Sequence, residues 1–394
     1  MLTDPMVSRL RPFTTTIFAE MSALAVATDA INLGQGFPDT DGPPAVLEAA
    51  RQAISDGVNQ YPPGPGRPEL RQAIAAVRAQ TYGQHFDPDT EVLVTVGATE
   101  AIAAAVLGLC EPGDEVIALD PCYDSYPAVV AMAGAVLRPV PLRPDATGRF
   151  ALDVDQLAAA ITPRTRLLLL NTPHNPTGTV LTDAELDGVA ELAVRHDLIV
   201  VTDEVYEYLT FDGVAHRPPA TFPGMAERTV TVSSAGKSFS VTGWKIGWAC
   251  GPAPLIAAVR AAKQFLTYVG GAPFQPAVTV ALTSELEWVR QLRGDLQRKR
   301  DRLSAGLRAA GFEVLHPQGT YFVMTDIRSL GESDGMRFCL ELPHRVGVVA
   351  VPGEVFFADS ERGKPFVRFA FCKRDEVIDA ACERLAGLHR ESGR

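Results

Sequence analysis

The sequence contains no C-x-x-C pair, and its six cysteines are scattered, most of them within apolar runs. Cysteines in that arrangement favour buried, reduced thiols over metal ligands or disulfides, so no metal site is expected. Nor is there a stretch of about 18 apolar residues without charge, glycine or proline, the length that a membrane-spanning helix needs. The N-terminal segment lacks an apolar run followed by a cleavage signal. These absences favour a cytoplasmic protein that does not cross a membrane.

Positive charge is also scarce, because 36 lysines and arginines face 47 aspartates and glutamates, giving a formal net charge of −11. A surface of that sign repels the phosphates of nucleic acid, so nucleic acid is not an expected partner. Net charge describes only the average field, and a local basic pocket remains compatible with it. Small-molecule substrates, including anionic ones, are therefore the expected partners.

The chain has 394 residues, more than one hydrophobic core usually organises, which predicts two domains. From about residue 45 to 280, short apolar runs alternate with Ala-rich helical stretches, the pattern of an α/β fold with a mainly parallel sheet covered by helices. The predicted strands of this part are 92–96, 115–119, 167–171, 198–202, 229–233 and 246–250.

After residue 280 the pattern changes to a long charged helix, expected at 285–310, followed by strand-like runs at 321–325, 346–351 and 366–371. We expect a smaller α+β domain there. The predicted organisation is a large domain over 46–280, a small domain over 281–394, and residues 1–45 as an N-terminal arm and part of the small domain.

Lys237 stands in the segment SSAGKSFS, directly after one of the apolar strands. Its small neighbours would let a planar group lie close to the backbone. A lysine that forms a Schiff base must spend part of its time unprotonated, and Lys245, eight residues on, supplies a cation that would lower its pKa or bind a phosphate. Two solvated lysines beside a strand are the alternative.

Asp203 ends the buried run LIVVTD, at the carboxyl end of a predicted strand, where open α/β sheets bind their ligands. A carboxylate there can pair with the protonated pyridine nitrogen of pyridoxal phosphate (PLP), whose charge makes the ring an electron sink. Tyr206 would reach the ring O3′ from the same crevice. The alternative for Asp203 is a helix N-cap.

Two turns also follow predicted strands. The first, Gly97-Ala98-Thr99, leads into a helix, and the free N–H groups at such a start suit a phosphate. The second, NTPHNPTG, presents Asn175 to a ligand, whereas His174 is interpreted as a turn residue. Each turn has a plain structural alternative without a ligand.

Arg368 lies in KPFVRFAFCK, a run otherwise suited to burial. A buried guanidinium needs an anion, and the α-carboxylate of a substrate offers bidentate geometry. An internal salt bridge is the alternative.

Together these motifs resemble the fold-type I, PLP-dependent aminotransferases of class I and II. The group includes kynurenine and methionine aminotransferases, and the nearest likeness is to N-succinyldiaminopimelate aminotransferases. The resemblance implies a fold-type I PLP-transferase, with a mixed, mainly parallel seven-stranded sheet covered by helices and a smaller α+β domain. The matching segments follow the family's order: NLGQGFPD, NQYPPGPG, VTVGATEAI, NTPHNPTG, DEVYE, SSAGKSFSVTGWKIGW and VRFAF.

The resemblance also implies site roles. Lys237 would carry PLP as a Schiff base and act as general acid and base, Asp203 would pair with the pyridine nitrogen, and Tyr206 would contact O3′ together with Asn175. The remaining cofactor contacts would be Ala98, Thr99, Ser234 and Lys245 at the phosphate, Tyr61 reaching the phosphate of a neighbouring subunit, and Tyr123 stacked on the ring. The substrate contacts would be Gly36, Arg368, Asn175, Phe18 and Tyr268, the last from the partner of a homodimer.

The activity implied is transfer of an amino group between glutamate and a keto acid, most closely N-succinyl-2-amino-6-ketopimelate. Lys263 and Arg67 are candidates for the distal carboxylates of that acceptor, with solvated surface charges as the alternative. Kynurenine, methionine or glutamine transamination and a cysteine-conjugate β-lyase remain open. A ligand-sensing domain without catalysis is a further hypothesis, disfavoured by the acidic balance and the lack of a helix-turn-helix segment.

Overall fold

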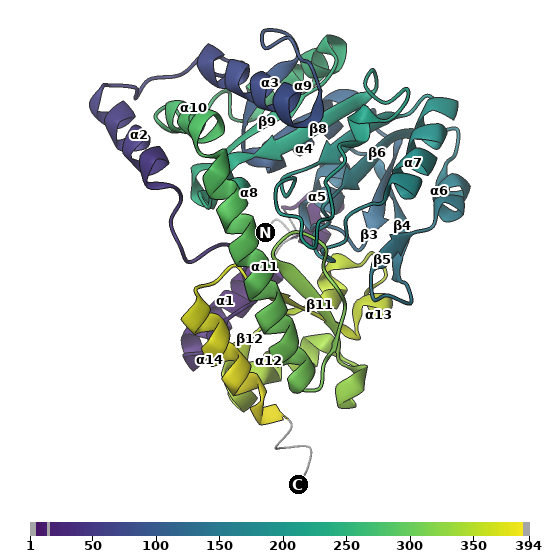
Figure 1. Cartoon of the computed structure of the whole chain (residues 1–394). Coiled ribbons are helices and arrows are strands. Elements are labelled where there is room, and N and C mark those ends of the chain that lie inside the picture. The colour runs from purple at the N-terminus through teal and green to yellow at the C-terminus, as the bar shows by residue number, and fades with distance from the viewer. Residues whose placement is uncertain (1–4, 14–15, 389–394) are drawn as a thin grey trace.

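The computed structural model describes residues 5–13 and 16–388. Residues 1–4, 14–15 and 389–394, which belong to the predicted N-terminal arm and small domain, lie outside the described part. Figure 1 shows a large sheet with its helices in the upper part of the molecule and a smaller group of helices and strands below it. The long helix α11 (Leu286–Ala309) runs from the upper part down along the smaller one.

The large sheet is mixed and mainly parallel, as expected. Strands β8, β7, β6, β3 and β4 are parallel, β9 is antiparallel to both of its neighbours, and β5 is antiparallel to β4. Its strand order is β2 (Val92–Val96), β9 (Ile246–Cys250), β8 (Thr229–Ser234), β7 (Ile199–Asp203), β6 (Thr165–Asn171), β3 (Glu115–Asp120), β4 (Val136–Pro144) and β5 (Phe150–Leu152).

The sheet has eight strands and not the seven that we expected. Strands β4 and β5 were both absent from the strands predicted along the chain. β4 contains Pro139, Pro141 and Pro144, which argue against a central strand because proline cannot donate to the ladder. Only the end of β4 pairs with the three-residue β5, so β4 is an edge strand over most of its length, where proline is tolerated.

Alternate residues of each strand point to opposite sides of the large sheet. Helices cover both sides, so both faces are buried. Val201 of β7 and Val232 of β8 lie on the face covered by α4 (Gly97–Leu109), α5 (Ser125–Met132) and α9 (Ala253–Leu266). The opposite face is covered by two groups of helices: α6 (Val154–Ala160) with α7 (Asp183–Arg195), and α2 (Pro44–Ser55) with α3 (Pro68–Tyr82) and α10 (Phe274–Ser284).

The smaller part is built on a four-stranded antiparallel sheet in the order β10-β11-β14-β13 and a parallel pair, β1 with β12. The pair joins the N-terminal segment to the C-terminal part of the chain. The strands are β1 (Ile31–Asn32), β10 (Glu313–Val314), β11 (Phe322–Asp326), β12 (Val348–Val349), β13 (Val351–Pro352) and β14 (Phe366–Ala370), and the helices are α1 (Ile17–Thr28), α12 (Gly335–Val346), α13 (Ser360–Gly363) and α14 (Asp375–Leu385). The short helix α8 (Ala235–Ser238) belongs to the large part, where it follows β8.

Several predicted elements are confirmed and one is split. Helix α11 lies within one residue of its expected bounds, and α7 begins with a capping box between Thr182 and Glu185. The strand expected at 346–351 is instead the end of α12 followed by the two short strands β12 and β13. The domain boundaries at residues 45 and 280 stay predictions. Within the described ranges, no helix is long and apolar enough to cross a bilayer.

Candidate active site

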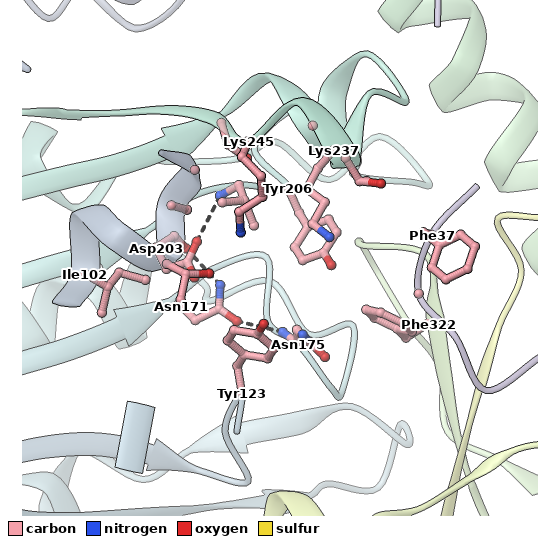
Figure 2. Close-up of a pocket in the computed structure, with 18 of the residues that line it drawn as sticks. Phe37, Ile102, Tyr123, Asn171, Asn175, Asp203, Tyr206, Lys237, Lys245 and Phe322 are labelled. Atoms are coloured by element: carbon pink, nitrogen blue, oxygen red, sulfur yellow. Dashed lines mark hydrogen bonds between the residues drawn. The ribbon is translucent and has the colours of Figure 1, made fainter. Parts of the chain in front are cut away.

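A cavity of about 280 Å³ opens at the carboxyl ends of the parallel strands. Every residue to which the sequence gave a cofactor or substrate role lines this cavity, except Tyr61, Tyr268 and the two candidates for a distal carboxylate, Lys263 and Arg67. In Figure 2, Lys245, Asp203 and Ile102 lie at one end, Phe37 and Phe322 at the other, and Lys237 and Tyr206 between them. The cavity therefore gathers residues from the large sheet, the N-terminal segment and the smaller part of the molecule.

Lys237 belongs to the short helix α8, directly after β8. Its Nζ forms no hydrogen bond or ion pair with any other described residue, and it lies 5.9 Å from the ring centre of Tyr206 and 5.7 Å from that of Tyr321. Burial lowers the pKa of Lys237 to about 8. An amine of this kind has an unprotonated fraction near neutral pH, as a nucleophile requires.

Asp203 is the last residue of β7 and is 5% exposed. The hydroxyl of Tyr126 donates to its Oδ2 at 2.6 Å and the N–H of Val205 to its Oδ1 at 3.2 Å, but no described cation pairs with it. Burial raises the pKa of Asp203 to about 6, although both hydrogen bonds oppose the rise. The carboxylate is thus held in place with its charge only partly compensated.

The start of α4 lies at the same end of the cavity as Asp203, beside Lys245 (Figure 2). Gly97 has a φ of +72°, and a Cβ at this position would lie 3.2 Å from Cε of Lys245, so glycine leaves room for the ammonium beside the first turn. Ala98 and Thr99 contribute N–H groups that have no acceptor inside a helix, and no side chain caps them. Ser234 lines the same corner, which has the donors and the charge of an anion site.

The turn after β6 is locked by its own amides. Asn171 donates through Nδ2 to the carbonyl of Asp203 at 2.8 Å and accepts from the N–H of Asn175 at 2.7 Å. His174 is buried, its Nδ1 lies 2.8 Å from Thr177 Oγ1, and burial lowers its pKa to about 3. His174 is therefore a structural residue of the turn, whereas Asn175 faces the cavity.

Arg368, on β14, is 2% exposed and forms no ion pair within the described part of the chain. Its Nη1 donates to Asn175 Oδ1 at 2.9 Å and its Nη2 to the carbonyl of Gly34 at 3.2 Å, while its buried Nε has no partner. Its guanidinium carbon lies 3.9 Å from the ring centre of Phe322 and is also flanked by Phe18 and Phe356. Burial lowers the pKa of Arg368 to about 10. Among the described residues, none forms the internal salt bridge with Arg368 that was the alternative from the sequence.

Tyr61 and Tyr268 lie outside this cavity and pack edge to face, with ring centres 5.6 Å apart. Both are exposed, Tyr61 at 82%. Lys263 holds their loops together, because its Nζ donates to the carbonyls of Gly64 and Tyr268. Lys263 is 2% exposed, so it is neither the solvated charge nor the substrate contact that the sequence suggested. Arg67, the other candidate, is partly exposed and does not line the cavity.

The sequence interpretation missed residues that hold the predicted ones. Tyr126, which binds Asp203, stands in the segment PCYDSY three residues after the predicted Tyr123. Tyr321 packs edge to face against Tyr206, with ring centres 5.2 Å apart, and donates to the carbonyl of Gly36 at 2.6 Å. The buried run that contains Tyr321 was recognised only as a strand, because its partner residues lie far away in sequence.

The fold and the cavity define a fold-type I transferase site, and comparison with known proteins places it further. Residues 28–385 match the family "Aminotransferase class I and II". A Mycobacterium tuberculosis protein named probable N-succinyldiaminopimelate aminotransferase is 61% identical over 391 residues, 97% of this chain and 98% of the relative. The solved structure of N-succinyldiaminopimelate aminotransferase from that organism covers 97% of this chain and 100% of its own, with a TM-score of 0.96.

Two other relatives carry different names. Methionine aminotransferase of Escherichia coli is 40% identical, over 98% of this chain and all of the relative. Kynurenine–oxoglutarate transaminase 3 of mouse is 38% identical, over 95% of this chain and 88% of the relative. The chain therefore belongs to the class I and II aminotransferases and is an aminotransferase, an enzyme of a family that is in general PLP-dependent.

Proposed function

We propose that the cavity binds pyridoxal phosphate and that the enzyme moves an amino group between glutamate and a keto acid. The observation that carries this proposal is the set of unpaired buried charges in one cavity. Among the described residues, Lys237 and Arg368 have no carboxylate partner and Asp203 has no cationic one. Buried charges are costly without partners, so a ligand that carries the complementary charges accounts for all three.

The residues present fit the cofactor group by group. The N–H groups of Ala98 and Thr99 beside Lys245 suit a phosphate, and Asp203 suits a protonated pyridine nitrogen. Asn175 and Tyr206 would contact O3′, and Tyr123, half-buried on the cavity wall, would stack on the ring. The unpartnered Nε of Arg368 is left for a substrate carboxylate, with Gly36 and Phe18 beside it.

When bound, pyridoxal phosphate supplies an aldehyde that condenses with amines and a ring that withdraws electrons. Lys237 would then move a proton with its Nζ from the substrate Cα to C4′, the carbon of the cofactor's aldehyde group, and the lowered pKa of about 8 permits this near neutral pH. Arg368 restricts the positions of Cα by holding the α-carboxylate. Asp203 keeps a proton at the pyridine nitrogen.

The proposed acceptor is N-succinyl-2-amino-6-ketopimelate, because the relatives at 61% identity are named for the corresponding aminotransferase. Transamination of kynurenine, methionine or glutamine is the alternative, since relatives near 40% identity are named for the first two. A comparison of kcat/KM for these substrates tests the choice. An alternative substrate preferred by tenfold or more, about 1.4 kcal/mol, would exclude the diaminopimelate assignment.

The β-lyase alternative needs a separate measurement. A cysteine conjugate offered without any keto acid should give no sustained release of pyruvate, because transamination stops once the cofactor has taken up the amino group. Continued pyruvate release would identify an elimination activity in place of transfer.

We also propose a homodimer in which Tyr61 and Tyr268 complete the partner's site. Both rings are exposed in one chain although Lys263 fixes their loops. A complementation experiment tests this. Tyr61→Ala and Lys237→Ala chains, each impaired alone, should regain activity after mixing and reassembly, because one site of each mixed dimer would combine an intact Lys237 with an intact Tyr61. Activity that stays at the sum of the two parents would refute sharing.

A cytoplasmic location and the division at residues 45 and 280 complete the proposal. All six cysteines are free thiols, which suits a reducing compartment. The division is supported by the separate cores of the large sheet and the smaller part. Limited proteolysis near residue 280 would test the boundary.

A further inference from the structure

Behind the cavity, on the far side of β7 and β8, lies a second group of buried charges. Arg78 of α3 is 2% exposed, and its guanidinium donates to Glu207 Oε2 at 2.7 Å and to Glu204 Oε2 at 3.0 Å. Glu204 is contacted in addition by Thr202 and by His216, whose Nε2 lies 2.9 Å from Oε2. We call Arg78, Glu204, Glu207 and His216 the buried ion cluster. None of the four lines the cavity.

Strand geometry ties this cluster to the site. Side chains alternate along a strand, so Asp203, on the cavity face of β7, is followed by Glu204 on the opposite face. The same alternation in β8 puts Ser234 at the cavity and Ser233 behind the sheet, where its hydroxyl donates to Glu207 Oε1 at 2.6 Å. A residue that lines the cavity therefore adjoins, at the end of β7, the cluster residue Glu204 and, in β8, Ser233, which binds the cluster residue Glu207.

The cluster stands where backbone pairing between the two strands ends. The last Cα pair of the β7–β8 ladder is Asp203 with Val232, followed by one bond from the N–H of Glu204 to the carbonyl of Val232 at 2.8 Å. Beyond this point the segment after β7 turns toward Tyr206, and the segment after β8 enters α8, which carries Lys237. Side chains of the cluster, and no longer the ladder, connect these two segments.

We propose that the buried ion cluster positions the cofactor-binding ends of β7 and β8. From helix α3, Arg78 binds both Glu204 and Glu207. Glu207 also accepts a hydrogen bond from Ser233 of β8. These contacts, all behind the sheet, would set the spacing between Asp203 and Ser234. Arginine suits this role because its planar fork reaches two carboxylates at once, and here its Nε also donates to Gln84 Oε1 at 2.9 Å. The inference rests on the proposed binding of pyridoxal phosphate.

The main test compares two conservative substitutions of buried arginines. Arg78→Lys keeps the charge but loses the fork. Arg149→Lys is the matched control, because Arg149 is also buried and paired with a buried carboxylate, Glu185, yet it forms no hydrogen bond or ion pair with the buried ion cluster. Both variants should lower the Tm. Only Arg78→Lys should raise the Kd for pyridoxal phosphate, by tenfold or more, and alter the visible circular dichroism of the bound cofactor.

A second pair of variants removes a single hydroxyl from the same face of β8. Ser233→Ala breaks the bond to Glu207 and should weaken pyridoxal phosphate binding several-fold. Thr231→Val is the control, because the hydroxyl of Thr231 is buried and has no partner. If Arg78→Lys does not fold, this pair decides the question.

The outcomes separate the two levels of the proposal. Wild-type protein that takes up no pyridoxal phosphate would refute the proposed function itself. Wild-type protein that binds the cofactor, with Arg78→Lys and Ser233→Ala within twofold of their controls, would overturn the positioning role and leave the function intact.

Discussion

Asp203 and Glu204 are neighbours in sequence, and both are buried carboxylates, but they stand in opposite electrostatic settings. Asp203 faces the cavity without a cation, and burial raises its pKa to about 6. Burial also acts on Glu204, but the charge of Arg78 and the hydrogen bond from His216 overcome it and lower the pKa to about 2. One face of the strand thus keeps its charges unpaired for a ligand, and the other pairs its charges within the protein.

The largest effect is expected from removing the unpaired amine of the cavity. Lys237→Ala should abolish turnover, since no other described amine lies at that position, while measurable affinity for pyridoxal phosphate remains through the α4 corner and Asp203. Lys237→Arg should fail likewise, because a guanidinium stays protonated. Single-turnover kinetics and an equilibrium cofactor titration check both statements. Near wild-type turnover in either variant would remove the assignment.

The contrast between the two carboxylates predicts stability changes of opposite sign in cofactor-free protein. An unfolded Asp titrates near 3.9 and Asp203 near 6, so the protonated form contributes stability that is lost as pH rises through 6. At pH 7.5, Asp203→Asn should therefore stabilise the protein by roughly 3 kcal/mol, and this gain should shrink at pH 4. Glu204→Gln should instead destabilise it by about 3 to 5 kcal/mol, because Arg78 loses a buried partner.

Denaturant unfolding at both pH values measures these changes. Saturating pyridoxal phosphate is the control, since the cofactor should remove the advantage of Asp203→Asn by supplying the missing partner. If both substitutions destabilised the cofactor-free protein equally, the two faces would not differ in the way that we describe.

A smaller effect is expected at Arg368. Arg368→Lys keeps a cation but loses the fork that binds Asn175, Gly34 and a carboxylate together. The loss of a bidentate pair should cost about 2 to 3 kcal/mol in kcat/KM for an amino acid donor. The corresponding amine without a carboxylate serves as the control substrate, because its slow reaction should change little. Equal losses for both substrates would show that Arg368 acts only through packing.

The smallest effect is expected at His174. Burial holds its pKa near 3, so the ring stays neutral near neutral pH and is too weak a base to take the proton from the substrate. His174→Gln, which can keep a bond to Thr177, should therefore leave the pH profile of kcat/KM unchanged. A profile that lost one of its limbs in this variant would make His174 part of the chemistry.

Several residues that line the cavity could be brought together from the sequence because they stand directly after strands. The carboxyl ends of parallel strands meet at one edge, so Asp203, Asn175 and Lys237 could be brought together without any knowledge of distant contacts. Lys263 shows the limit of this reasoning. Its helix is amphipathic, but only the folded chain places the carbonyls of Gly64 and Tyr268 around its ammonium.

Two other failures have similar causes. Tyr126 and Arg78 contact their partners across 77 and 126 residues of sequence, and neither stands in a local pattern that points to those partners. Strand β4 was missed for the opposite reason, because its prolines form a local signal that the edge of the sheet overrides. Local sequence patterns therefore predicted which side chains each segment offers to the cavity. Which distant residues bind those side chains depends on tertiary packing.

The burial of the thiols has a practical consequence for experiments on this enzyme. Five of the six cysteines are buried and Cys382 is partly so, and burial raises the pKa of all six. Alkylating reagents attack thiolates, so the folded wild-type chain should stay unlabelled at neutral pH. A cysteine substituted for the exposed Glu287 would be the single site for a fluorophore or crosslinker, and none of the native cysteines would need to be replaced first.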